Sequence, residues 1–161
     1  MKELFENIPE KNPKNIFNSV LIDTCFLVYV FEHNEKIDRL RGLCEKKYVG
    51  MTSFNIEEFL HIEHKIPESV RHNVRKFLHS NPNMFRLNID VTPGNAEAER
   101  MFVRNVDEEL LKHIQDPSDA VLIATAINIG ADILTRDKHH LYTSHLENFL
   151  NRYDIKVLNK I

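Results

Sequence analysis

Short apolar segments alternate with amphipathic helical segments along this chain, and this alternation most limits the fold it can adopt. The clearest unit is DPSDAVLIATAINIGADILTRD (residues 116–137), where a capped helical segment ends at Gly130 and the strand-like ADILT follows. Strands separated by helices form a parallel sheet with helices on both faces. We therefore expect an α/β fold, a three-layer α/β/α sandwich with a central, mainly parallel sheet.

The same patterns place the other elements. Strands are expected at residues 19–23, 48–52, 85–91, 131–135 and 155–159. Helices are expected after residue 23 through residue 31, around residues 37–44, from an N-cap at Ser53 to Pro67, over 68–79, from Pro93 and Gly94 to just before Asp116, and over 116–130.

Chain length and composition indicate one domain. The chain has 161 residues, of which 42% are apolar, enough for one substantial core. Residues 1–18 are polar and are expected to form an N-terminal arm or short helix that leads into a single domain over 19–161. Neither a membrane-spanning stretch nor a signal-peptide pattern is present, so we expect a soluble, cytoplasmic protein with no membrane partner.

Charge and cysteine content narrow the class further. A net charge of −3 argues against tight, non-specific coating of nucleic acid, although it leaves room for a nuclease with an acidic site. Cys25 and Cys44 have no metal-binding spacing, and we expect both to be buried thiols in a reducing compartment.

Acidic residues recur at one end of the expected elements. Asp23 ends the first strand, and Glu58 lies in the early turns of the helix after the second. Asp119 lies in the first turn of the helix over 116–130, and Asp137 follows the strand after that helix. Carboxylates at one sheet edge repel one another unless a cation neutralises them, and hard oxygen ligands suit Mg²⁺ or Mn²⁺. The pattern predicts a divalent-metal site of the kind that handles phosphate.

Each acid also has a local explanation. Asp23 and Thr24 could cap the helix that follows them, and Glu58 could complement a helix dipole. Asp137 could begin a turn. These separate explanations do not predict that all the acids lie at the same end of their elements, and we therefore favour a shared site.

Asp116 differs from the other acids. Asp116-Pro117-Ser118-Asp119 places an acid at the N-cap, proline at the first helical position and an acid at the third, as in a capping box. We interpret Asp116 as a helix cap first and an outer-shell metal ligand second.

Three blocks of the sequence resemble the PIN-domain ribonucleases, which include the VapC-type toxins of toxin–antitoxin pairs. The blocks are VLIDTCFLV, MTSFNIEEFL and DAVLIATAINIGADILTRDKHHL, and the last is the most specific. The resemblance implies an RNA-cleaving enzyme that uses Mg²⁺ or Mn²⁺, a homodimer, and an antitoxin as protein partner. The implied catalytic and metal-binding residues are Asp23, Glu58, Asp119 and Asp137, and Thr24 and Thr135 fall on the supporting hydroxyl positions.

Under this interpretation, Thr24 orients Asp23 and Thr135 hydrogen-bonds a carboxylate or the attacking water. Arg136 and Lys138 beside Asp137 are the foremost candidates for contact with substrate phosphate. His139 is a further candidate beside Asp137, and Lys46, Lys47, Arg71, Arg75 and Lys76 are more speculative ones.

Two other classes stay open. A catalytically inactive PIN-like module would bind RNA or protein without turnover, and it would bind Mn²⁺ feebly. A receiver-like phosphoacceptor domain also has acids at strand ends, but it needs adjacent acids after the first strand, and IDTC supplies one. Glu58-x-x-His61 imitates half of a di-iron motif whose second half we do not find.

Overall fold

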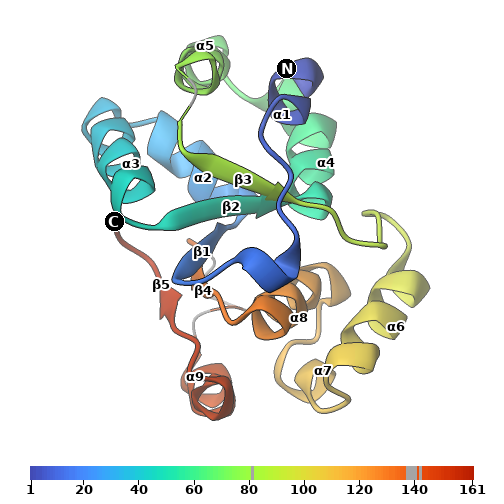
Figure 1. Ribbon diagram of the computed structural model, residues 1–161. Helices are drawn as coiled ribbons and strands as arrows, with labels where there is room; N and C mark the ends of the chain where they lie inside the picture. The colour runs from blue at the N-terminus through green and yellow to red at the C-terminus, as the bar shows by residue number, and fades with distance from the viewer. Residues whose placement is uncertain (81, 137–140, 142) are drawn as a thin grey trace.

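The computed structural model describes residues 1–80, 82–136, 141 and 143–161. Its centre is a five-stranded sheet with strand order β3-β2-β1-β4-β5, in which all neighbouring strands are parallel (Figure 1). The strands are β1 (Ser19–Ile22), β2 (Tyr48–Thr52), β3 (Met84–Leu87), β4 (Asp132–Leu134) and β5 (Val157–Leu158).

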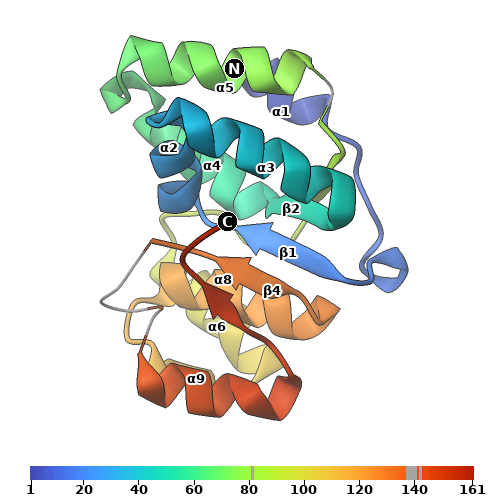
Figure 2. The same ribbon diagram turned by 90° about the vertical axis from the view of Figure 1, so that its left-hand side faces the viewer.

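Helices cover both faces of this sheet, which confirms the expected α/β/α sandwich (Figure 2). On one face lie α1 (Lys2–Glu6), α2 (Thr24–Phe31), α3 (Asn34–Lys46), α4 (Ser53–Ile62) and α5 (Glu68–His79). On the other lie α6 (Ala96–Val106), α7 (Leu110–His113), α8 (Pro117–Ile129) and α9 (Ser144–Leu150). Short 3₁₀ helices occur at Pro13–Asn15, Glu63–Lys65 and Asn151–Tyr153.

The central strands are largely apolar because both of their faces are buried, and β1 has a single polar residue, Ser19, at its start. Val20 and Ile22 pack with the α1–α5 side, whereas Leu21 packs with the α6–α9 side. Successive side chains of a strand point to opposite faces, so a strand covered on both faces needs apolar residues at every position. This explains why β1 has no polar alternation.

Residues 1–18 extend the sheet. Phe5 and Ile8 are buried in the core beneath α1–α5. The amide of Arg86 in β3 donates to the Pro9 carbonyl at 2.9 Å, and the amide of Lys11 donates to the Arg86 carbonyl at 3.0 Å. These bonds cover backbone groups of β3 that would otherwise form a sheet edge. The division of the chain at residue 18 stays a prediction.

The cap of α4 and the end of β3 differ from the sequence-based prediction, and both differences involve Thr52, the last residue of β2. Thr52, not Ser53, is the N-cap of α4, because its hydroxyl accepts the Asn55 amide at 3.0 Å. The Ser53 hydroxyl accepts the Ile89 amide at 3.1 Å. Thr52 is the last residue of β2 and pairs with Leu87, so β3 ends at Leu87 and not at residue 91.

The single helix expected between Gly94 and Asp116 is divided into α6 and α7. Asp107 has extended backbone angles and ends α6, and its carboxylate accepts the Glu109 amide at 2.7 Å to form a turn. Helix α9 was not predicted from the sequence. No helix in the described part of the chain is long and apolar enough to cross a bilayer.

Candidate active site

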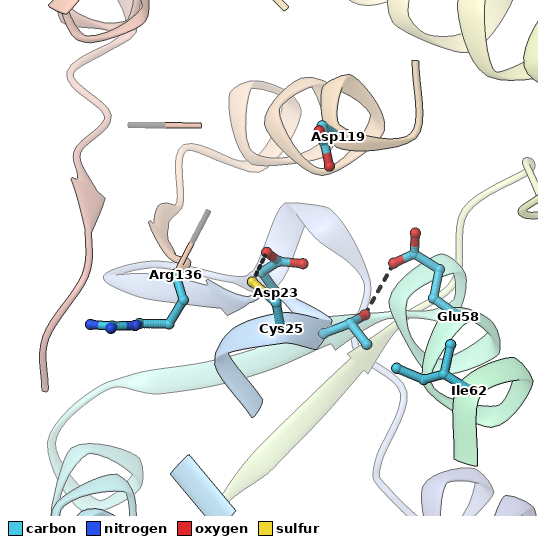
Figure 3. Close-up of a pocket in the computed structure, with 7 residues that line it drawn as sticks. Asp23, Cys25, Glu58, Ile62, Asp119 and Arg136 are labelled. Carbon is cyan, nitrogen blue, oxygen red and sulfur yellow. Dashed lines mark hydrogen bonds between the residues drawn. The ribbon is translucent and has the colours of Figure 1, made fainter. Parts of the chain in front are cut away.

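The strand order changes direction at β1, and this places a crevice at the carboxyl edge of the sheet. The chain proceeds from β1 to β2 and β3 on one side, and β4 and β5 lie on the other. Parallel α/β sheets bind ligands where the strand order reverses. A pocket of about 430 Å³ lies at this edge, lined by Asp23, Thr24, Cys25, Glu58, Ile62, Asp119 and Arg136 (Figure 3).

Asp23 follows β1 and directs its carboxylate into this crevice. It occupies the N-cap position of α2, yet its side chain accepts no capping hydrogen bond from that helix. Its Oδ2 atom accepts from the Thr135 hydroxyl at 2.8 Å and from the Cys25 thiol at 2.8 Å. Asp23 is therefore the N-cap of α2 by position but does not cap it through its side chain, and the expectation that Thr135 bonds a carboxylate is met.

Glu58 lies one helical turn into α4 and is held by two donors. Its Oε2 atom lies 3.0 Å from the Thr24 hydroxyl and 3.1 Å from the Asn55 side-chain nitrogen. Asn55 is 3% exposed, and its side-chain oxygen accepts from the Thr52 hydroxyl at 2.7 Å. A chain of hydrogen bonds thus runs from the end of β2 to the Glu58 carboxylate.

This arrangement corrects one expectation and adds one residue. The Thr24 hydroxyl contacts Glu58, whereas we expected it to orient Asp23. Asn55 was missed by the sequence-based prediction. The signal was its position three residues before Glu58 and three after Thr52, a spacing that places side chains on one helix face.

The three carboxylates affect one another electrostatically. Burial raises the pKa of Glu58 from 4.5 to about 7, and the negative charges of Asp23 and Asp119 act in the same direction, against the hydrogen bonds from Thr24 and Asn55. Without a cation, the pocket therefore disfavours a further negative charge near neutral pH. A bound cation would relieve this repulsion.

Asp119 lies in the first turn of α8, facing Asp23 and Glu58 across the pocket (Figure 3). Asp116 is the N-cap of this helix, since its Oδ1 atom accepts the Ser118 amide at 2.9 Å. Its expected role as a cap is therefore confirmed. The partial positive charge of a helix N-terminus favours a carboxylate in the first turn.

A buried acid outside the pocket supports the start of α8. Glu99 of α6 is 2% exposed, and its carboxylate accepts from the Gly94 amide at 3.0 Å and from the Ser118 hydroxyl at 3.1 Å. It thereby ties α6 to the turn that carries Asp119. The sequence-based prediction did not identify Glu99, which looks like an ordinary acid in the first turn of a helix.

Comparison with known proteins identifies the family. The family model of the PIN domain matches residues 20–145. The chain belongs to the PIN-domain family. PIN domains are generally nucleases, so membership supports hydrolase activity. No curated protein matches the sequence.

Solved structures share the PIN fold at low sequence identity. One is a chain of VapBC2 from Rickettsia felis bound to a DNA fragment from their promoter; it has 15% identity and a TM-score of 0.59, over 89% of this chain and 99% of that one. Another is a domain of a functionally unknown protein from Methanocaldococcus jannaschii DSM 2661, at 17% identity and a TM-score of 0.50, over 88% and 90%. At these identities, the likeness shows the fold.

Cys25 is an unexpected member of the PIN-domain pocket. The expectation that it is buried is wrong, because its place in the first turn of α2 leaves it exposed; Cys44 is buried as expected. Although the residue as a whole is exposed, the surrounding atoms partly desolvate its thiol, and this desolvation together with the charge of Asp23 raises the thiol pKa to about 12. The thiol therefore stays protonated at neutral pH and donates to Asp23.

The donors around the pocket fit a hard divalent cation. They comprise the carboxylates of Asp23, Glu58 and Asp119, with hydroxyl groups that orient the first two. Within residues 1–80, 82–136, 141 and 143–161, no three His, Cys, Asp or Glu side chains already have the spacing of a metal site. Asp137 and Lys138, together with His139, lie outside the described residues.

The residues expected to contact phosphate lie in different parts of the structure, and one of them lines the acidic pocket. Arg136 lines the pocket of this PIN domain. Arg75 pairs with Glu68 at 2.9 Å, and Arg71 pairs with the same carboxylate. Lys47 pairs with Asp132 at 3.6 Å, and Lys46 precedes β2 at the opposite edge of the sheet. Lys76 lines a separate hollow on α3 and α5.

Proposed function

We propose that this PIN domain is a divalent-metal-dependent endoribonuclease that hydrolyses RNA phosphodiester bonds at the pocket formed by Asp23, Glu58 and Asp119, with Asp137 as the fourth acid. One observation carries the proposal: three carboxylates from three different elements line one pocket at the carboxyl edge of the sheet (Figure 3). PIN-domain nucleases generally need a divalent metal, and these donors suit Mg²⁺ or Mn²⁺.

The carboxylates would hold the cation, and their neighbours fix them in place. A bound Mg²⁺ or Mn²⁺ supplies Lewis acidity, which activates water and neutralises charge that develops on the phosphate. Thr135 holds one oxygen of Asp23. Thr24 and Asn55 hold one oxygen of Glu58, which leaves the second oxygen available to the pocket. Asp119 is carried by the capped first turn of α8.

Arg136 and Lys138 are proposed to contact the phosphate groups of the substrate. Arg136 lines the acidic pocket and offers a planar, permanently charged donor that suits phosphate. Among the described residues, no carboxylate forms an ion pair with it. Lys138 enters this proposal on its sequence position alone.

The proposal extends to a toxin of a toxin–antitoxin pair, acting in the cytoplasm as a homodimer with an antitoxin as partner. The likeness to a chain of VapBC2, a complex solved on a fragment of its promoter, supports this extension. The open acidic pocket would be the surface that such a partner must occupy to stop cleavage.

The test compares cleavage of labelled single-stranded and structured RNAs in Mn²⁺, in Mg²⁺ and in EDTA. Wild-type protein should cut with either metal and not in EDTA. Asp119→Asn and Glu58→Gln should lose the cleavage and retain the fold. Glu57→Gln is the matched control, because it removes the adjacent acid, which does not line the pocket. Wild-type cleavage in EDTA, or full activity of the Asp119→Asn variant, would refute the proposal.

The inactive-module alternative gives a different result. A protein that had lost turnover would show no cleavage with either metal, and its calorimetric titration with Mn²⁺ would show weak heat or none. The proposal predicts measurable Mn²⁺ binding by wild type that Asp119→Asn weakens.

A further inference from the structure

A second hollow, of about 250 Å³, lies next to the acidic pocket. Residues that line it include Tyr29, Lys36, Arg39, Arg136, Asn159 and Lys160. Arg136 lines both pockets, so the two share a wall. Any chain molecule that leaves the acidic pocket on this side would pass over the second hollow.

Four of the eight residues that line this second pocket are cationic, and the others include Phe26 and Ile161. Lys36 and Arg39 come from α3, Arg136 follows β4, and Lys160 follows β5. Lys36 pairs with Glu35 at 3.1 Å. Within the described parts of the chain, Arg39, Arg136 and Lys160 form no ion pair with a carboxylate. Four cations at one site are a strong local concentration in a chain whose net charge is −3.

Tyr29 fixes the direction of Arg136. The guanidinium carbon of Arg136 lies 4.1 Å from the Tyr29 ring centroid, and the Lys36 ammonium lies 4.8 Å from it. Such contacts hold a cation over an aromatic face. Figure 3 shows the Arg136 side chain extending away from Asp23, Glu58 and Asp119. Its guanidinium group therefore does not neutralise the carboxylates of the acidic pocket.

We propose that this second pocket binds a backbone phosphate of the RNA strand, next to the phosphodiester that is hydrolysed at the acidic pocket. The inference rests on the proposed function and adds a subsite to it. Arg39, Arg136 and Lys160 contact the phosphate oxygens, since guanidinium and ammonium groups suit phosphate. Tyr29 is a positioning residue that acts through Arg136.

RNA binding without turnover tests the subsite. The probe is a short fluorescein-labelled single-stranded RNA, titrated by fluorescence anisotropy with Ca²⁺ in the buffer over a series of salt concentrations. The variant Arg39→Ala/Lys160→Ala removes two cations that lie outside the acidic pocket. The charge-matched control is Lys14→Ala/Lys46→Ala, whose lysines precede β1 and β2 at the opposite edge of the sheet.

The subsite predicts a change in both affinity and salt dependence. Each lost phosphate contact on a single strand reduces the slope of log affinity against log salt by about 0.7, so the double variant should lose about 1.4. Its affinity at low salt should fall roughly fivefold to tenfold. The control should keep the wild-type slope. Equal slopes in the two double variants would overturn the proposal.

The role of Tyr29 has its own readout. Tyr29→Leu should weaken RNA binding and reduce the salt slope by about 0.7, because Arg136 loses the ring that directs it. Tyr29→Phe keeps the ring and should bind like wild type. If both variants bind like wild type, Tyr29 has no positioning role.

The outcomes of these experiments are separable from those of the proposed function. Binding is measured without cleavage, so a wild-type protein that binds RNA but never cuts it would refute the nuclease and leave the subsite intact. If the Arg39→Ala/Lys160→Ala variant binds RNA normally but loses binding of a polyglutamate peptide, the pocket belongs to an acidic protein partner, and the RNA subsite is wrong.

Discussion

The hydroxyl of Thr135 donates a 2.8 Å hydrogen bond to Oδ2 of Asp23, which joins the residues that follow β4 and β1. Thr135 is 1% exposed, so this bond lies in a dry environment where its loss cannot be replaced readily by water. The bond fixes one oxygen of a proposed metal ligand, and the packing of the two central strands therefore sets the orientation of the site.

Replacement of Thr135 by valine should weaken metal binding. Valine keeps the shape of threonine and removes the donor, and loss of such a supporting bond typically costs about 10-fold to 100-fold in metal affinity. Calorimetric titration with Mn²⁺ measures the effect. Thr125→Val is the control, because Thr125 is a buried threonine of α8 whose hydroxyl bonds the Val121 carbonyl within the helix. Equal Mn²⁺ affinity in the two variants would contradict the prediction.

Glu58→Gln should stabilise the metal-free protein above neutral pH. The pKa of Glu58 is raised from 4.5 to about 7, so the folded state holds a proton that the unfolded state releases. That contribution is complete below about pH 4.5 and is lost as the pH rises through the folded value. Glutamine carries no charge and keeps an oxygen to accept from Thr24 and Asn55.

Thermal unfolding in EDTA between pH 5 and pH 8 measures this difference. After an allowance for solvent exposure of the carboxylate, the variant should gain about 1 kcal/mol over wild type at pH 8 and little at pH 5. Glu57→Gln should show no such pH-dependent gain. Saturating Mn²⁺ should reverse the order, because the metal stabilises the protein that binds it more tightly. A Glu58→Gln protein that is less stable than wild type at pH 8 in EDTA would disprove the electrostatic explanation.

The fold was predictable because each of its signals is local. The apolar β1, the capped helix before Gly130 and the strand after it each show their pattern within a few residues. The placement of Asp23, Glu58 and Asp119 followed from the rule that parallel strands end at one edge, and the structure brings these three to one pocket. Asp137 lies beyond the described residues, and its part in the site stays a prediction.

The residues that sequence reasoning missed depend on contacts between distant segments. The role of Glu99 depends on its hydrogen bond with Ser118, which is nineteen residues away. Thr24 contacts Glu58 because α4 packs beside α2. Cys25 lies in an apolar run, so its exposure was visible only once the pocket was formed. The Tyr29 and Arg136 pair joins segments more than a hundred residues apart, which no local pattern encodes.

Gly50→Ala should destabilise the fold. A Cβ atom at Gly50 would lie 2.2 Å from the Phe85 ring, so either the ring or the pairing of β2 with β3 must shift. Overpacking of this kind costs about 1 to 3 kcal/mol. Urea denaturation measures the loss, and Phe85→Leu in the Gly50→Ala background should recover part of it, as in a double-mutant cycle.

Gly42→Ala provides the contrasting control. Gly42 lies inside α3, and a Cβ there meets no atom within 4 Å. Alanine costs less backbone entropy than glycine in a helix, so this variant should gain about 0.5 to 1 kcal/mol. Opposite signs for the same chemical change would show that the close approach of Phe85, and not helix or strand propensity, requires the glycine at position 50.

Glu99→Ala should reduce both stability and Mn²⁺ affinity. Removal of the buried carboxylate breaks its hydrogen bonds with the Gly94 amide and the Ser118 hydroxyl. Gly94 is exposed and Ser118 is half-buried, so water can replace part of what is lost, and we expect a total cost of about 1 to 3 kcal/mol. The turn that carries Asp119 should loosen, so the fall in Mn²⁺ affinity should exceed that of an equally destabilised variant such as Gly50→Ala. Calorimetry on both proteins, at a temperature where both are folded, makes the comparison.

Glu99→Gln separates the hydrogen bonds from the charge. Glutamine can accept from Gly94 and donate to the Ser118 hydroxyl, so this variant should retain most of the Mn²⁺ affinity that Glu99→Ala loses. If Glu99→Gln loses affinity as fully as Glu99→Ala, the charge of Glu99 acts on the site directly, and its role as a support for the first turn of α8 is wrong.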